Sequence, residues 1–223
     1  GVTGEPLQRE DRITLLKRAL RERILVLAEA MGTSLQGANL TAQDYGGEAQ
    51  DGSCENLNLM RPDLVRSIYE NYFKVDADII VTNSFSGSPL VLAEFELEDK
   101  VREINRAAGL ICRDAADRYS SKAKPRFVAG SIGPTNKALS VTGGITFDAL
   151  VDNFAIQAAA LYEGDIDYFL IETCQDMRNI KAALLALDKV FETQDPIPIA
   201  VSVTIEPSGT MLAGQGVEAA YAS

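Results

Sequence analysis

Five stretches of this chain share one pattern of hydrophobic and polar positions. Each is an apolar run that ends in small polar or acidic residues and is followed by a segment of helical periodicity; the runs are Ile24–Leu27, Asp78–Val81, Phe127–Gly130, Phe169–Ile171 and Ile199–Val203. Continuous apolar runs are typical of strands that are buried on both faces, and parallel neighbours must be joined by helical crossovers. The pattern therefore predicts a parallel sheet with helices between its strands.

The predicted fold is α/β, of the (β/α)8 TIM-barrel type but apparently incomplete, with about five βα units. We expect one domain over residues 1–223, because that length suits a single core better than two. The polar residues that end the runs should gather at the carboxyl ends of the strands, where TIM barrels carry their chemistry. A sheet of five strands also leaves two open edges, through which we expect self-association.

Helices are expected between the runs. Apolar residues such as Leu16 and Leu20 predict an amphipathic helix over Asp11–Arg23 that caps the amino-terminal end of the barrel. Pro62 should open the next helix, since the first turn does not need its missing N–H. Residues 32–60 predict a long loop, which is usually functional in a compact domain. Further helical regions are expected at about 90–119, 147–163 and 177–192.

Composition narrows the classes of function. The net charge of −11 argues against nucleic acid and anionic membranes as partners, because both require clustered basic residues. No apolar run approaches the roughly 20 residues of a membrane span, and the start of the chain lacks the features of a signal peptide. We therefore expect a cytoplasmic protein whose cysteines, Cys54, Cys112 and Cys174, are free thiols.

The chain contains no histidine, which removes the commonest general base and the commonest metal ligand. Ser-His-Asp, Cys-His and His-metal mechanisms are thereby excluded for this chain. Cys54 and Cys174 could reach the same end of the sheet, but two cysteines are too few for a zinc site. Cys112 is expected to lie on a helix and to be buried in the protein core. Lys137 is better interpreted as a solvated loop lysine than as a Schiff-base residue.

Polar residues after three of the runs are candidates for binding. Glu172 follows three apolar residues, so its carboxyl should be partly desolvated and should need a cation or several donors. A ligand ammonium would serve, and a neighbouring Lys or Arg is the alternative. Thr82 and Asn83 suit a small polar ligand, although they could equally form a turn or a helix cap. Ser131 lies in a glycine-containing loop that could approach a ligand closely.

Several motifs, taken together and in this order, resemble the homocysteine S-methyltransferase family, and within it the homocysteine-binding barrel of cobalamin-dependent methionine synthases. They cover nearly the whole chain from about residue 21 onward. The matching segments are Ala30–Thr33, Asn58–Asp63, Ala77–Ile80 with Thr82–Phe85, Glu103–Ala108, Val128–Lys137, Leu170–Thr173 with Asp176, and Thr210–Glu218.

The resemblance implies a methyltransferase whose barrel binds L-homocysteine and a zinc ion. Zinc would hold the substrate sulfur as a thiolate, which attacks a methyl donor such as methylcobalamin on another module. Carried over by position, Glu172 would bind the amino group of homocysteine, and Thr82, Asn83 and Ser131 would line the same pocket. No catalytic residue is assigned in this chain.

Departures from the family pattern favour a second interpretation. The family's three zinc-ligand cysteines lie at later strands than this chain contains, so no metal ligand is assigned here. An Asp-Gly pair after the first strand is replaced by Ala28-Glu29, and a Glu at the end of the second strand is replaced by Val81. Glu29 could substitute for one lost acidic contact if the backbone shifts. The alternative is therefore a catalytically inactive barrel fragment that serves as a binding or interaction module.

Overall fold

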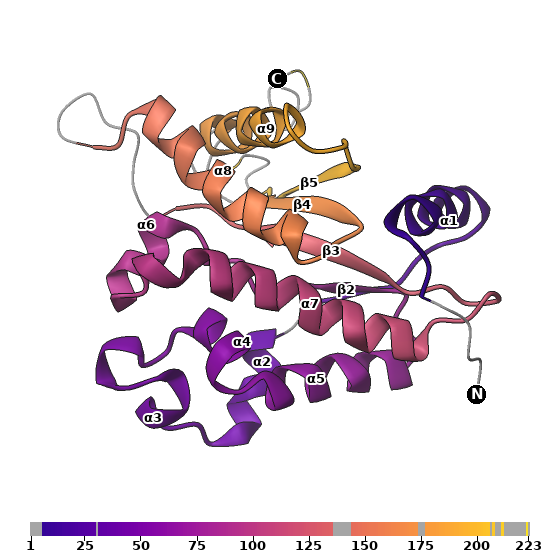
Figure 1. Ribbon diagram of the computed structural model, residues 1–223, viewed down its shortest axis with the longest axis horizontal. Helices are drawn as coiled ribbons and strands as arrows, with labels where there is room; N and C mark the ends of the chain where they lie inside the picture. The colour runs from indigo at the N-terminus through magenta and orange to yellow at the C-terminus, as the bar shows by residue number, and fades with distance from the viewer. Residues whose placement is uncertain are drawn as a thin grey trace.

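The computed structural model describes residues 6–29, 31–135, 144–173 and 177–205, together with Pro207, Met211 and Ala222. Within them, five parallel strands form one sheet in the order β1-β2-β3-β4-β5. The strands are β1 (Leu27–Ala28), β2 (Ile79–Val81), β3 (Phe127–Ile132), β4 (Tyr168–Thr173) and β5 (Ile199–Val203). This arrangement confirms the predicted parallel α/β half-barrel (Figure 1).

Helices connect the strands as the periodicity predicts. Pro62 begins its helix as expected, and helix boundaries agree closely at 147–163 and 177–192. The α-helices are α1 (Arg9–Glu22), α2 (Met31–Leu35), α3 (Ala42–Tyr45), α4 (Leu57–Met60), α5 (Pro62–Lys74), α6 (Pro89–Leu92), α7 (Val101–Tyr119), α8 (Phe147–Glu163) and α9 (Met177–Phe191). None of the helices in the described part of the chain is both long and apolar enough to cross a bilayer.

Two of the predicted connections were wrong in detail. Residues 32–60 are not one loop but a series of short helical turns: α2, α3 and α4, with the 3-10 turns η1 (Gln36–Ala38), η2 (Glu48–Gln50) and η3 (Cys54–Asn56). Local bonds such as the capping box of Thr41 and Asp44 hold these turns without the long apolar stripe by which helices are recognised. The helical region at 90–119 is divided into α6, η4 (Ala93–Phe95), η5 (Glu98–Lys100) and α7, because Glu96 adopts a left-handed conformation.

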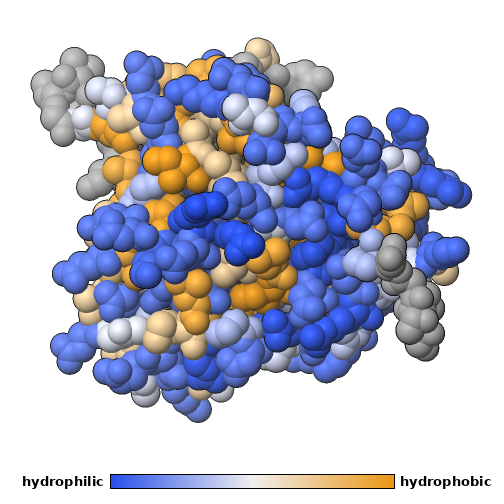
Figure 2. All heavy atoms as spheres, in the orientation of Figure 1, coloured by the Kyte–Doolittle hydropathy of each residue, from blue (hydrophilic) through white to orange (hydrophobic). Residues whose placement is uncertain are grey.

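The central strands of the sheet, β2 to β4, are buried on both faces, which accounts for their continuous apolar runs. On one face, Ile80, Val128 and Phe169 pack beneath α5, α7, α8 and α9, and Figure 1 shows these helices following one another along that side. On the other face, Phe127 and its neighbours pack against Leu16 and Ala19 of α1. The outer face of the helices is largely hydrophilic, with smaller apolar areas between the charged side chains (Figure 2).

The two edges of the sheet differ from its centre. β1 is shorter than the predicted run: Ile24 is 90% exposed and precedes the strand, because Arg23 and the Val26 N–H turn instead toward the carboxylate of Asp78. At the other edge, Ile199, Val201 and Val203 of β5 are each about two-fifths exposed. Self-association through these edges stays a prediction.

A buried ion cluster fixes α1 at the amino-terminal end of the sheet. The fully buried carboxylate of Asp167, just before β4, accepts hydrogen bonds from Arg12 Nε at 2.7 Å and from Arg113 Nη1 at 2.9 Å. It also accepts the backbone N–H of Val128 at 2.8 Å. The predicted position of the helix is thus confirmed. Its predicted apolar stripe was partly wrong, because Arg12 is buried through this pairing while Leu20 is 59% exposed.

Two glycines bring α7 and α8 into direct backbone contact. A Cβ added at Gly109 of α7 would lie 2.4 Å from the carbonyl oxygen of Gly164, the residue that ends α8. Such a separation is far inside van der Waals contact, and the obstacle is backbone that has no rotamer to change. Only glycine at position 109 permits this close crossing of the two helices.

We expect Asp167→Asn to destabilise the fold by about 3 kcal/mol or more, because the change leaves two buried guanidinium groups without their shared anion. Urea denaturation of the wild type and the variant measures the difference. The control is Asp152→Asn, which removes an ion pair with Lys189 in which both side chains are more than half exposed. Equal midpoints for the two variants would contradict a central role for the Asp167 cluster.

The Gly109→Ala substitution should also destabilise the fold, by about 1–3 kcal/mol. Helix propensity alone predicts that the variant is more stable than the wild type, because Ala is favoured over Gly by up to about 1 kcal/mol inside a helix. Gly37→Ala is the matched control, since a Cβ at that glycine meets no atom within 4 Å. Thermal melts of both variants distinguish steric conflict from propensity, and a Gly109→Ala melt at or above that of the wild type would refute the close contact.

Candidate functional site

The polar residues predicted at the strand ends lie around one opening at the carboxyl end of the sheet. A cavity of about 320 Å³ lies beside β1, β2 and β3. Its walls contain Glu29, Thr82, Asn83 and Ser131, four of the five predicted site residues; the other lining residues are Met31, Gly32, Thr33, Cys54, Glu55, Val81, Ser84 and Phe85. The fifth, Glu172 of β4, is not among these lining residues, but it accepts a hydrogen bond from Ser131, which is.

Two carboxyl groups meet at Glu172. Ser131 donates its hydroxyl to Glu172 Oε2 at 2.8 Å, and the carboxyl of Glu29 interacts with the same group. Burial first, and then the neighbouring Glu29, raise the pKa of Glu172 to about 8, although the hydroxyl of Ser131 lowers it. Within the described residues, neither glutamate forms an ion pair with Lys or Arg. The carboxyl of Glu172 thus favours a proton that a bound cation could replace.

The hydrogen bonds among the hydroxyl groups that follow β2 and the end of β3 can be assigned a donor and an acceptor. Ser84 donates to the carbonyl oxygen of Ser131 at 2.7 Å, so its only hydrogen is used there. The 2.6 Å contact between Thr82 and Ser84 must then be donated by Thr82. Thr82 Oγ1 in turn accepts the N–H of Ser131 at 2.9 Å. The hydroxyl of Thr82 therefore offers a ligand at most a lone pair.

Asn83 is also held by its neighbours. Its amide nitrogen donates to the carbonyl of Cys54 at 2.7 Å and to Asn58 Oδ1 at 3.1 Å, while Asn58 donates to the backbone carbonyl of Asn83 at 2.8 Å. Both amide hydrogens of Asn83 are thus used within the protein. Its side-chain oxygen accepts no bond from the described residues and remains available to a donor on a ligand.

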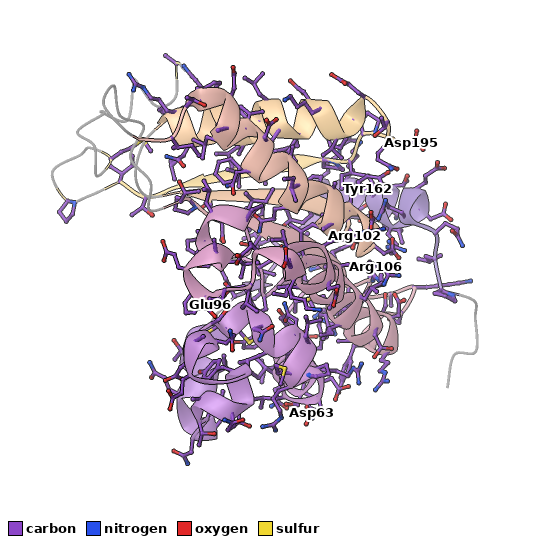
Figure 3. All side chains as sticks on the ribbon, turned by 60° about the vertical axis from the view of Figure 1, so that its left-hand side comes forward. Asp63, Glu96, Arg102, Arg106, Tyr162 and Asp195 are labelled. Atoms are coloured by element: carbon purple, nitrogen blue, oxygen red, sulfur yellow. The ribbon has the colours of Figure 1, made fainter. Side chains whose placement is uncertain are left out.

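Buried amides behind the cavity hold the turn that follows β2. Asn105 donates to the carbonyl of Gly87 at 2.8 Å, and Gln157 donates to the carbonyl of Ser84 at 2.7 Å. Asn105 is fully buried, whereas its neighbour Arg106 lies on the outside of α7 (Figure 3).

Sequence reasoning missed Glu55, which lies on the cavity wall and is only 7% exposed. The segment that carries it was expected to be a functional loop, but no pattern within that loop distinguished this glutamate from the surface acids. Its neighbour Cys54 was expected to reach this end of the sheet and does so. Burial and then the carboxyl of Glu55 raise the pKa of the Cys54 thiol, which disfavours the thiolate.

Metal ligands are not assembled in the described part of the chain. No group of three or more Cys, Asp or Glu residues there could hold a metal ion. Cys112 is fully buried in α7, as expected, and Cys54 is the one described cysteine that lines the cavity. Cys174 and Lys137, together with Asp176 and the matching segment at 210–218, lie outside the described residues except for Met211. The residues described at this cavity do not fit a zinc site.

Comparisons with known proteins agree with the sequence motifs. The family model described as homocysteine S-methyltransferase matches residues 25–223. Methionine synthase of Mycobacterium leprae (strain TN) is 36% identical over 211 residues, which is 94% of this chain and 17% of that protein. The chain therefore spans only about a sixth of the length of this relative.

The fold is also found in solved structures. Crystal structures of the homocysteine methyltransferase MmuM from Escherichia coli, in its oxidised and metallated forms, superpose on the chain with a TM-score of 0.75 and 20% sequence identity. The matches cover 93% of this chain and 71% or 72% of theirs. At that identity, the likeness establishes the shared fold.

The carboxyl pair predicts a pH-dependent effect of Glu172→Gln on stability. Because the folded pKa of Glu172 is about 8 against an ordinary 4.5, the folded state binds more protons than the unfolded state between those values. Glu172 therefore destabilises the wild type increasingly as pH rises through that window. The advantage of the variant in urea denaturation should grow from pH 5 to pH 8.5, whereas Glu94→Gln, a change at an exposed position, should show no such trend. A constant difference for Glu172→Gln would disprove the shift.

Proposed function

The chain belongs to the homocysteine S-methyltransferase family, and from this premise we propose that its cavity binds L-homocysteine for transfer of a methyl group to the substrate sulfur. One observation carries the proposal: the half-buried carboxyl of Glu172 interacts with the carboxyl of the exposed Glu29, and neither has a cationic partner among the described residues. The ammonium group of an amino acid is a cation of the right size for such a pair.

Binding of the ammonium would exchange one cation for another. In the free protein, the carboxyl of Glu172 retains a proton near neutral pH, first because burial disfavours its charged form and then because Glu29 lies beside it. An ammonium group bound beside Glu172 favours its ionisation, so the proton is released to solvent. Ser131 keeps Glu172 oriented by donating its hydroxyl at 2.8 Å. In this scheme Glu29 compensates for the acidic residue that the family pattern has in place of Ala28.

Other residues of the cavity wall suit the remainder of the substrate. The Asn83 side-chain oxygen supplies a further acceptor for the ammonium, and Thr82 Oγ1 holds Ser131 by accepting its backbone N–H at 2.9 Å. Val81, Met31 and Phe85 provide apolar surface in the same cavity, as the methylene groups and the sulfur of homocysteine require. Val81 replaces an acidic residue of the family pattern and makes this part of the wall apolar.

Activation of the thiol lies outside what the described residues supply. Because they do not form a metal site, we derive no step through zinc, and their role in the proposal is to bind and orient the amino acid. Zinc, and a methyl donor such as methylcobalamin on a separate module, enter the proposal through the family resemblance and the relationship to a methionine synthase. The alternative of an inactive interaction module is not favoured, since the family match covers residues 25–223.

Isothermal titration with L-homocysteine under reducing conditions tests the proposal. Affinity should rise between pH 6 and pH 7.5, by at most tenfold per unit, because Glu172, with a pKa of about 8, must release its proton for the ammonium. Glu172→Gln should weaken binding at least about tenfold, since it removes a charge-assisted hydrogen bond, and should flatten the pH dependence.

Glu94→Gln serves as the control and should bind as the wild type does. If the wild type shows no binding of homocysteine at millimolar concentration, the proposed function is wrong for this chain. If Glu172→Gln binds as tightly as the wild type, the assignment of the ammonium site is wrong.

A further inference from the structure

Glu55 is a buried acid on the cavity wall that takes no part in the proposed ammonium site. It lies in η3 and is 7% exposed, yet it lines the cavity. Its Oε1 accepts the backbone N–H of Ser86 at 2.9 Å. Within the described residues, no Lys or Arg pairs with it, and the N–H of Ser86 is the one hydrogen bond that it accepts from another residue. One oxygen is thus held in place by Ser86, and the residue lines the cavity.

The chemical form of Glu55 follows from its surroundings. A buried carboxylate without a cation is strongly disfavoured. Burial raises the pKa of Glu55 more than the backbone N–H of Ser86 lowers it. The group therefore tends to retain its proton, and a carboxylic acid that accepts one bond at Oε1 can donate its O–H from the other oxygen.

Hydrogen-bond donors are scarce elsewhere on this wall. The hydroxyl hydrogens of Thr82, Ser84 and Ser131 are used within the protein, at Ser84, at a carbonyl and at Glu172. Both amide hydrogens of Asn83 are used as well. Apart from Glu55, the strong side-chain donor on the described lining is the hydroxyl of the exposed Thr33. None of the described residues that line the cavity is Lys or Arg.

An amino acid nevertheless brings a carboxylate as well as an ammonium. We propose that Glu55 is the specificity-determining residue for that carboxylate, to which it donates its carboxyl O–H. This inference rests on the proposed function, since it presumes an amino acid in the cavity. Hydrogen bonds between a neutral acid and a carboxylate are short and charge-assisted. A carboxyl group kept neutral by an apolar site is an established form of hydrogen-bond donor.

The use of an acid in place of a basic residue has a physical reason. A guanidinium or ammonium side chain in a cavity of about 320 Å³ would be attracted to the Glu29 and Glu172 carboxyls. It would then occupy the position that the ligand ammonium requires. A neutral O–H donor binds a carboxylate without competing for that pair.

Matched ligands and variants test the inference in the 223-residue chain. The ligands are L-homocysteine and 3-aminopropane-1-thiol, which has the same ammonium and thiol but no carboxylate. Glu55→Ala should weaken binding of homocysteine at least about tenfold while changing the affinity for the aminothiol less than threefold. Glu55→Gln keeps an acceptor for Ser86 and an N–H donor for the ligand, and should stay within about threefold of the wild type for both. If Glu55→Ala does not fold, Glu55→Met replaces it as a donor-free residue of similar length.

The outcomes separate this inference from the proposed function. If Glu55→Ala weakened the binding of both ligands equally, the proposed contact of Glu55 with the carboxylate would be refuted, and the proposed ammonium site would stand. Loss of homocysteine binding in Glu55→Gln would also overturn it, because an ionised glutamate would then be required. If the wild type bound neither ligand, the proposed function would fail and the inference with it. Selective loss of homocysteine in the donor-free variant, with retention in Glu55→Gln, is the expected result.

Discussion

The fold depends on one buried carboxylate, that of Asp167. It joins three elements that are distant in sequence: α1 through Arg12, α7 through Arg113, and β3 through the N–H of Val128. Removing a charge from water is costly unless its partners are placed accurately, so the cluster tolerates few alternative arrangements. It thereby fixes the register of β3 against β4 at their amino-terminal ends. The parallel pairing extends this register along both strands to Ser131 and Glu172.

The two ends of the sheet therefore treat charge in opposite ways. At the amino-terminal end, Asp78 and Asp167 are matched with arginines. At the carboxyl end, Glu29, Glu55 and Glu172 lack basic partners among the described residues; an N–H group holds Glu55 and a hydroxyl holds Glu172 instead. Paired charges stabilise the scaffold, whereas the unpaired acids are available to form ion pairs or hydrogen bonds with a ligand. Such division of labour is expected where a fold keeps its chemistry at one edge.

Much of this arrangement could be predicted from the sequence, because it follows from periodicity. The five runs predicted the strands, and parallel pairing was enough to place Thr82, Ser131 and Glu172 at one edge. Contacts between distant residues could not be predicted in that way. The burial of Arg12 depends on Asp167, which is 155 residues away, and Asn105 is buried because it holds the turn at Gly87. Glu55 was missed because short helical turns carry no periodic signal.

The ordered hydroxyls between β2 and β3 have a consequence for which molecules the cavity rejects. With the hydrogens of Thr82 and Ser84 directed into the protein, this wall faces a ligand with lone pairs. A 2-oxo acid of the same length carries a carbonyl oxygen where the amino acid carries its ammonium. On the side of Thr82 and Ser84 that oxygen would meet acceptors it cannot bond, so a proton on Glu172 would be its donor. Where that donor is lost, the penalty of an unsatisfied acceptor falls on the 2-oxo acid and not on the amino acid. The orientation of two hydrogens thus gives this wall a means of disfavouring 2-oxo acids.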